Sequence, residues 1–139
     1  MNKKLSIHTT GQGLHEITNE VTQIVQDANI EDGLCTVFVR HTSASLTIQE
    51  NADPSARHDL EKWLCRIVPE NDPHFTHTHE GPDDMPSHIK SALTATTLSI
   101  PIMDGRLVLG TWQGIYLWEH RTNSHLRKVI INVISSHRE

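Results

Sequence analysis

The chain has 139 residues, of which 36% are hydrophobic and 21% are charged, and its formal net charge is −5 at pH 7. This length fits one domain over residues 1–139, and the composition can fill one modest core. The acidic net charge argues against binding to nucleic acid or to an anionic membrane surface. No apolar run approaches the roughly 20 residues of a membrane span and no signal peptide is recognisable, so we expect a cytoplasmic protein.

Two hydrophobic periods alternate along the chain. Alternating apolar and polar residues are typical of half-buried strands, whereas apolar residues three or four positions apart indicate amphipathic helices. The pattern predicts an α+β fold, a compact single domain with a mainly antiparallel, sandwich-like β-sheet and covering helices. In chain order, we expect a strand at Leu5–Ile7, a helix from Thr18 to about Gly33, strands at 34–40 and 45–50, a helix from Asp53–Pro54 to Pro69, a short helix from Pro86 to Leu93, and strands at 98–102, 107–111, 115–118 and 129–131.

Single residues add detail to these elements. Thr18 is expected to cap the first helix, and Asp53 followed by Pro54 is a strong helix start. The Asp104–Gly105 pair predicts a hairpin turn, and Val129–Ile131, apolar on both faces, indicates a central strand. The second helix is expected to bury an apolar stripe made of Leu60, Trp63, Leu64 and Ile67.

The two cysteines are too few for a secreted disulfide scaffold. Because Cys35 and Cys65 each fall within an apolar pattern, we expect both to be buried, reduced and unreactive. Trp112 and Trp118 share the parity of one strand region, and a core position is favoured over one that faces a ligand.

Histidine is the most unusual feature of the composition, with eleven copies, three of them within residues 74–79. Histidine supplies metal ligands and proton-transfer groups near neutral pH. Residues 70–84 show no periodicity, and so long an irregular loop is usually functional or disordered. Neither a local zinc-protease motif nor a phosphate-binding loop is present. A metal site can still be assembled from residues of distant segments.

Four histidines at the ends of expected elements are the candidate site residues. Each alone is more often a surface or capping residue, but their common placement beside polar groups favours a site. Asp83, Asp84 and Glu119 can orient imidazole rings, although Asp83 and Asp84 can equally cap the helix entered at Pro86. The four candidates are His41, His77, His88 and His120.

Other histidines and a serine nucleophile are less favoured. His74 and His79 are interpreted as solvated loop residues, and His8, His125 and His137 as exposed. Serines also neighbour candidate histidines, but adjacency in sequence is not hydrogen-bond geometry, so a serine hydrolase is disfavoured. These serines are Ser43, Ser45 and Ser87.

Three segments, His41–Leu46, Asp83–Lys90 and Gly110–Ile115 followed by Glu119–Arg121, closely resemble the YjbQ-type family of small bacterial and archaeal proteins. The resemblance runs from about residue 13 to about residue 134. It implies a compact α+β fold that assembles as a homotrimer, with a secondary thiamine-phosphate synthase activity that joins a pyrimidine diphosphate to a thiazole phosphate and releases pyrophosphate. The polar cluster that it implies consists of His41, Asn51, Asp53, His77, His88, Glu119 and His120.

We therefore expect a metal-binding homotrimeric enzyme, a transferase that acts on a small phosphorylated or anionic metabolite. The expected ligands are His77, His88 and His120, for a divalent transition metal such as zinc, because a histidine cluster suits zinc better than magnesium. The expected catalytic residues are His41, Glu119 and Asp84. The expected substrate-binding residues are Asn51, Asp53, Lys90 and Arg121.

Two alternatives stay open. One is a metal-dependent hydrolase or lyase of unknown substrate, since a divalent ion with an open position can activate water. The other is a non-catalytic module that binds a metabolite or metal through the same residues.

Overall fold

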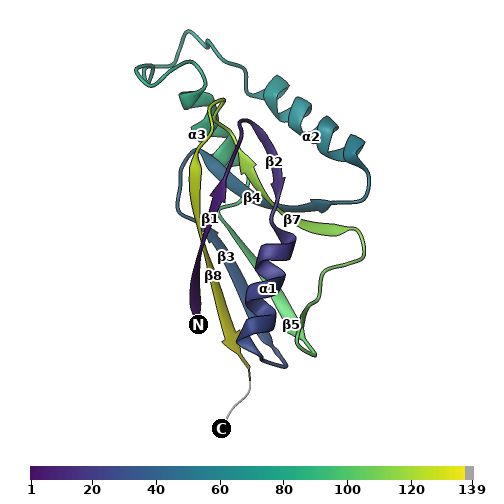
Figure 1. Cartoon of the computed structure of the whole chain (residues 1–139). Coiled ribbons are helices and arrows are strands. Elements are labelled where there is room, and N and C mark those ends of the chain that lie inside the picture. The colour runs from purple at the N-terminus through teal and green to yellow at the C-terminus, as the bar shows by residue number, and fades with distance from the viewer. Residues whose placement is uncertain (137–139) are drawn as a thin grey trace.

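Two antiparallel sheets and three helices make up residues 1–136, which are the residues that the computed structural model describes (Figure 1). The larger sheet has the strand order β1-β8-β3-β5-β6 and the smaller sheet has the order β2-β7-β4. The α+β expectation is confirmed. The elements are β1 (Asn2–His8), β2 (Gly13–Glu16), α1 (Thr18–Ala28), β3 (Gly33–Val39), β4 (Ala44–Glu50), α2 (Pro54–Ile67), α3 (Asp84–Leu93), β5 (Thr97–Met103), β6 (Arg106–Leu107), β7 (Gln113–Glu119) and β8 (Leu126–Ser135).

The main core lies between α1 and the inner faces of both sheets. Val21 and Val25 of α1 are buried against inward-facing residues of the strands. β8 pairs with β1 on one side and with β3 on the other, so the prediction of a central strand is confirmed. The strand residues of this core are Ile7, Cys35, Val37, Val39, Ala44, Leu46, Ile100, Ile102, Ile115, Leu117, Val129, Ile131 and Val133.

β7 is buried on both faces, because α2 and α3 cover the face that does not meet the main core. Ile115 and Leu117 belong to the main core, whereas Tyr116 and Trp118 pack in a second cluster with residues of α2. Successive side chains of a strand point to opposite faces. This alternation also separates the two polar residues at the end of the strand, Glu119 and His120.

The second helix starts as expected but presents a narrower buried face. Asp53 is the N-cap of α2, and its carboxylate accepts a hydrogen bond from the Ser55 N–H at 2.9 Å. The expected four-residue stripe is wrong, because only Leu64 is buried, while Trp63 and Ile67 are 49% and 48% exposed. α2 lies over one face of the three-stranded sheet (Figure 1), where Leu64 packs with Tyr116 and Trp118 of the central strand β7. Because this sheet is narrow, it buries only part of the expected stripe.

The first helix begins differently from the expectation. Ile17 occupies the N-cap position, and Thr18 is the first helical residue. The Thr18 hydroxyl donates to Glu16 and accepts the backbone N–H of Ile115, each at 2.8 Å. Thr18 therefore connects α1 to β7. A threonine in this role and a threonine that caps a helix look the same in the sequence.

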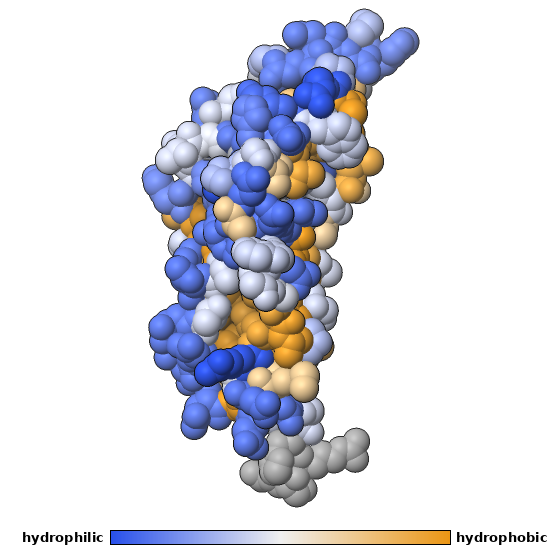
Figure 2. Space-filling model, turned by 90° about the vertical axis from the view of Figure 1, so that its right-hand side faces the viewer, coloured by the Kyte–Doolittle hydropathy of each residue, from blue (hydrophilic) through white to orange (hydrophobic). Residues whose placement is uncertain are grey.

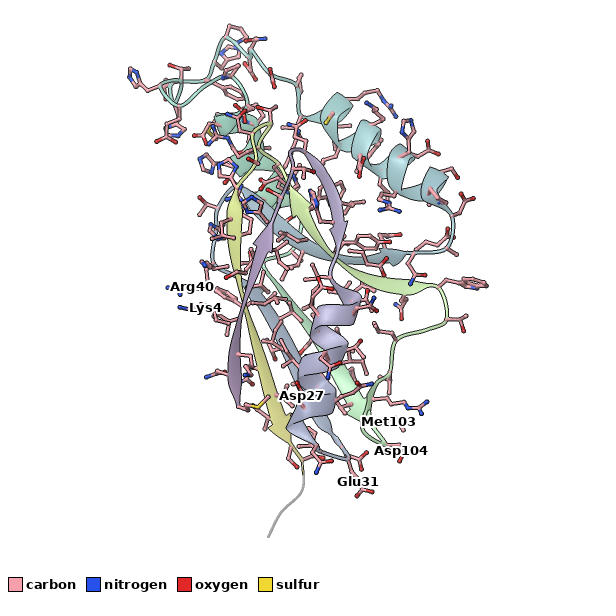
Figure 3. All side chains as sticks on the ribbon, in the orientation of Figure 1. Lys4, Asp27, Glu31, Arg40, Met103 and Asp104 are labelled. Carbon is pink, nitrogen blue, oxygen red and sulfur yellow. The ribbon has the colours of Figure 1, made fainter. Side chains whose placement is uncertain are left out.

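The expected hairpin after residue 103 is shorter than the sequence indicates. The Asp104–Gly105 turn is present, with positive φ angles of 51° and 77°, and Figure 3 labels Asp104 at this tip. Only Arg106 and Leu107 pair with β5. The Val108 N–H still donates to the Pro101 carbonyl at 3.1 Å, but Pro101 has no N–H to return a bond, so the ladder ends there.

Apolar side chains also reach the surface. Figure 2 shows separate hydrophobic patches between hydrophilic residues on one side of the molecule. On the larger sheet, the face turned away from the core exposes Leu34, Phe38, Leu126 and Ile134. No helix within the described residues has the length and apolar character needed to cross a membrane. His8 is exposed as expected, and His137 lies outside the described residues.

The two cysteines differ, contrary to the expectation that both are buried. Cys35 faces the main core, and burial raises the pKa of its thiol to about 11. Cys65 is exposed on α2, because it lies beside the narrow buried face of that helix.

We predict that a thiol reagent such as iodoacetamide modifies one cysteine of the native chain, and that this cysteine is Cys65. Cys35 should react only after denaturation, because the thiolate is the reactive form and burial disfavours it. Mass spectrometry of labelled peptides measures both rates. Native labelling that persists in a Cys65→Ser variant would contradict the difference.

Candidate metal centre

Two histidines and one aspartate converge at the start of α3. Asp84 is the first residue of that helix and His88 lies one turn later, on the same face, while His77 comes from the preceding loop. The Nε2 atoms of His77 and His88 lie 2.7 Å and 3.2 Å from the same atom, Asp84 Oδ2. The three candidate ligand atoms lie within 4.8 Å of one another, so one ion can contact all of them.

The hydrogen bonds of His88 require a positive charge at this point. Its Nδ1 lies 2.9 Å from the Thr42 carbonyl oxygen, which can only accept, so Nδ1 carries a proton. A neutral ring then has a lone pair on Nε2, and that lone pair faces a carboxylate oxygen. The contact is favourable only if a second proton or a cation lies between Nε2 and Asp84.

The donor set fits a divalent transition metal. Two imidazoles with one carboxylate occur in catalytic zinc sites and in related iron sites. In a tetrahedral zinc site, ligand atoms about 2.1 Å from the ion are about 3.4 Å apart. The 3.2 Å contact of His88 with Asp84 is close to this spacing, whereas the 2.7 Å contact of His77 is at hydrogen-bond distance and would lengthen around an ion. The hydrogen bond from His88 to a backbone carbonyl is the usual outer contact of a ligand histidine.

The group is buried on its carboxylate side and open on its histidine side. The side chain of Asp84 is 2% exposed, whereas those of His77 and His88 are 49% and 29% exposed. A cavity of about 260 Å³ borders His77, with Phe75 and Met85 among its walls. A small ligand therefore has access to the histidine side.

Arg121 holds the aspartates in place. Its Nη1 donates to Asp84 at 2.8 Å, its Nε donates to Asp83 at 2.7 Å, and its Nη2 donates to the Glu80 carbonyl at 2.9 Å. Burial by itself raises the pKa of Asp84, but the hydrogen bond from His77 and the influence of His88 and Arg121 lower it overall. The carboxylate is thus ionised at neutral pH. These bonds use three of the five N–H donors of Arg121 and hold its guanidinium against both aspartates.

Glu119 is enclosed in the core rather than open to a ligand. Its carboxylate accepts hydrogen bonds from the Thr9 hydroxyl at 2.7 Å, from the Arg127 guanidinium and from the Arg121 N–H at 3.1 Å. Burial raises the pKa of Glu119, but the bonds from Arg127 and Thr9 outweigh this effect and lower it overall. Glu119 is therefore a positioning residue that links Arg127 to Arg121.

His41 also has a partner that limits proton transfer. Its Nε2 accepts the Lys128 N–H at 2.8 Å, so the nitrogen that could take up a proton is occupied. Burial and the charge of Arg127 lower its pKa, which keeps the ring neutral. His41 is two residues from Ser43, whose carbonyl accepts a hydrogen bond from Arg127. In this arrangement His41 joins the β3–β4 connection to β8.

His120 and Lys90 lie away from the His77, Asp84 and His88 group. They line a different cavity, between α2 and the smaller sheet, together with Cys65. His120 Nε2 lies 2.8 Å from the Ser45 hydroxyl, but no carboxylate orients the ring, and Ser45 is 1% exposed. The pair therefore lacks the third member and the access of a serine hydrolase.

Asn51 and Asp53 lie at the opposite end of β4 from the candidate centre. Seven strand residues separate Asn51 from the loop at Ser43, a distance of about 26 Å in extended chain. Asp53 caps α2, and Asn51 donates to the Gln113 carbonyl at 3.5 Å. Within one chain, they do not join the other expected site residues.

The structure thus groups part of the expected site and adds residues to it. It brings His77, His88 and Asp84 together, with Asp84 in the place expected for His120. Arg127 was not expected, although a signal exists: it shares the inward parity of Val129 and Ile131 on β8, where a charge needs a partner.

We predict that Glu119→Gln destabilises the chain by about 3–5 kcal/mol at pH 7, because it leaves the Arg127 charge buried without its partner. Since the pKa of Glu119 lies below its ordinary value of 4.5, the ionised pair stabilises the fold above that pH and loses this effect as the pH falls. Urea unfolding at several pH values measures both. A Glu119→Gln, Arg127→Met double variant should recover part of the loss, and additive effects would contradict the coupling.

The comparisons with known proteins agree on one family. The family model described as UPF0047 protein YjbQ-like matches residues 3–136. UPF0047 protein sll1880 of Synechocystis sp. is 54% identical over 129 residues, which are 93% of this chain and 88% of that protein. UPF0047 protein YjbQ of Escherichia coli O157:H7 is 44% identical over 129 residues, 92% of this chain and 93% of that protein.

Solved structures agree as well. A conserved protein of the YjbQ/UPF0047 family from Clostridium acetobutylicum superposes with a TM-score of 0.88 at 36% identity, over 95% of this chain and 99% of that chain. A conserved hypothetical protein from Thermus thermophilus gives a TM-score of 0.84 at 33% identity, over 95% and 99%. The chain therefore belongs to the YjbQ-like UPF0047 family.

Proposed function

We propose that the chain is a metal-dependent enzyme whose ion is held by His77, Asp84 and His88. The observation that carries the proposal is the His88 ring, which donates from Nδ1 to Thr42 and turns Nε2 toward the Asp84 carboxylate. A divalent ion at this point supplies the positive charge that the contact requires. Zinc is the first candidate, because imidazole nitrogens suit it better than they suit magnesium.

The residues of the chain have distinct tasks in this proposal. A bound divalent ion supplies positive charge that polarises and orients an anionic substrate. Asp84 holds the ion from the buried side, and Arg121 keeps that carboxylate ionised and oriented. The side chains of His77 and His88 are partly exposed on the opposite side, and His77 borders the neighbouring cavity. The walls at Phe75 and Met85 suit an apolar part of the substrate.

The proposed reaction is a group transfer on a small phosphorylated metabolite, of the thiamine-phosphate synthase type that the sequence resemblance implies. An ion beside an open cavity suits the leaving diphosphate, because a divalent cation can neutralise the charge that develops on it. Hydrolysis of a phosphorylated or carbonyl substrate is the second candidate. The set of two histidines and a carboxylate favours it, because hydrolytic zinc enzymes use that set.

We predict that untagged chain binds about one zinc ion, and that His88→Ala weakens binding by more than about 100-fold, since even outer partners of a ligand contribute about 10–100-fold. His120→Ala should bind as the parent does, because His120 lies in the other cavity. Calorimetric titration and elemental analysis measure these affinities, and activity assays with the pyrimidine and thiazole precursors follow on the same samples.

His79→Ala is the matched control, since it removes a histidine from the same loop outside the group. Circular dichroism confirms that each variant is folded. Equal zinc in the parent and the His88→Ala variant would refute the centre. Loss of zinc in His120→Ala with retention in His77→Ala would instead support a set built around His120.

We also propose that the chain assembles as a homotrimer through the outer face of the larger sheet. Leu34, Phe38, Leu126 and Ile134 are exposed there, and Leu34 and Phe38 are paired in register with Ile134 and Ile130. An apolar sheet face of this kind is typical of an interface between subunits.

We predict a mass of three chains in light scattering at micromolar concentration. Phe38→Asp should shift the mass toward one chain, because burial of a carboxylate in the interface is unfavourable. Trp63→Asp, on the exposed side of α2, should leave the mass unchanged. A parent chain that is monomeric would refute the assembly.

A further inference from the structure

A second cavity lies on the other side of α3 from the candidate metal centre. It has a volume of about 100 Å³ and lies between α2, α3 and the end of β7. Lys90 of α3 lines it, and Lys90 is two residues beyond His88. Two helical residues turn the chain by about 200°, so these side chains leave nearly opposite faces of α3.

Lys90 brings a charge into this cavity that no residue balances. It is 4% exposed, and its Nζ donates to Cys65 Sγ at 3.5 Å. Within residues 1–136, Nζ forms no ion pair with any carboxylate. An ammonium has three N–H donors, and a thiol is a weak acceptor. A buried ammonium without a counter-ion is unfavourable, so the chain retains it at a cost in stability.

His120 adds a second polar atom to the same cavity. The ring is 1% exposed, and its Nε2 lies 2.8 Å from the Ser45 hydroxyl. Burial, with the charge of Lys90, lowers its pKa to about 3, so the ring is neutral at pH 7. Its Nδ1 makes no hydrogen bond within the described residues. Among these residues every fully buried side-chain nitrogen has a hydrogen-bond partner, so Nδ1 must be accessible. Nδ1 therefore faces the cavity, and it carries the ring proton in the tautomer in which the Ser45 hydroxyl donates to Nε2.

The other charged residues of the cavity do not offset Lys90. The Glu119 carboxylate is occupied by Thr9 and Arg127. At the rim, Glu61 accepts the Leu14 N–H at 2.8 Å, and Lys62 is exposed. These two rim residues have opposite charges, so the inner part of the cavity is positive.

We propose that this cavity binds a small oxyanion, a phosphate or carboxylate group, through Lys90 Nζ and His120 Nδ1. Such a group balances the buried charge and receives charge-assisted hydrogen bonds from both donors. The cavity has room for several water molecules, and therefore for a group of this size. The site does not depend on the proposed metal centre, since the two lie on different faces of α3.

Cys65 provides the means to test it. This thiol is exposed and touches Lys90 Nζ, so an anion held at Lys90 obstructs the approach of a reagent. The rate of Cys65 alkylation by iodoacetamide is measured on the full chain after EDTA treatment, which removes any contribution from the metal centre. Inorganic phosphate and acetate are compared at a constant ionic strength set with sodium chloride.

At an anion concentration about ten times its Kd, we expect alkylation of Cys65 to slow by about ten-fold. Protection by phosphate alone assigns a phosphate site, and protection by acetate alone assigns a carboxylate site. Lys90→Met should abolish the protection, whereas Lys90→Arg, which keeps the charge, should retain part of it. Lys62→Met is the matched control at the rim and should retain most of it.

Two results would overturn the proposal. One is an alkylation rate that neither anion changes beyond the effect of chloride. The other is equal protection in the parent and in the Lys90→Met variant. If Lys90→Met does not fold, calorimetric titration of the parent and the Lys90→Arg variant with phosphate and acetate decides, and absence of a binding heat in both refutes the site.

Discussion

The guanidinium of Arg127 lies inside the main core, and the candidate centre depends on how its charge is balanced. Glu119 accepts that charge, and the same carboxylate accepts the backbone N–H of Arg121. The Arg121 side chain then reaches Asp83 and Asp84. Charged and polar groups thus connect the interior of the larger sheet to the carboxylate that faces the two histidines. Hydrogen bonds therefore connect a residue of β8, distant in sequence, to Asp84.

Much of the fold could be predicted because its signals are local. The Asp53–Pro54 helix start and the Asp104–Gly105 turn depend on the conformations of the residues themselves. The width of the buried face of α2 depended instead on the sheet that it packs against. Because that sheet is narrow, it does not bury the whole apolar stripe of the helix. The short β6 strand likewise depended on pairing with Pro101, which lies across the sheet. Tertiary contacts of this kind leave no periodic signal in the segment that they affect.

The candidate site was predictable to the same extent. His77, Asp84 and His88 lie within twelve positions, so a loop and one helical turn are enough to bring them together. His120 was grouped with them because it follows a strand beside Glu119, but neighbouring strand residues face opposite sides of a sheet. Asp84 was expected to take part in catalysis or to orient a ring, and the structure places its oxygen at the point where both imidazoles converge.

The alternation along β7 has a consequence for how this chain can change during evolution. Glu119 faces the core and His120 faces the cavity at Lys90, so one strand serves two chemically different compartments. An insertion or deletion of one residue within β7 would exchange the faces. An insertion would place a carboxylate beside Lys90, and a deletion would place an imidazole against the buried Arg127 charge. Substitutions on one face of β7 can be tolerated one at a time, but its length can change only in steps of two residues.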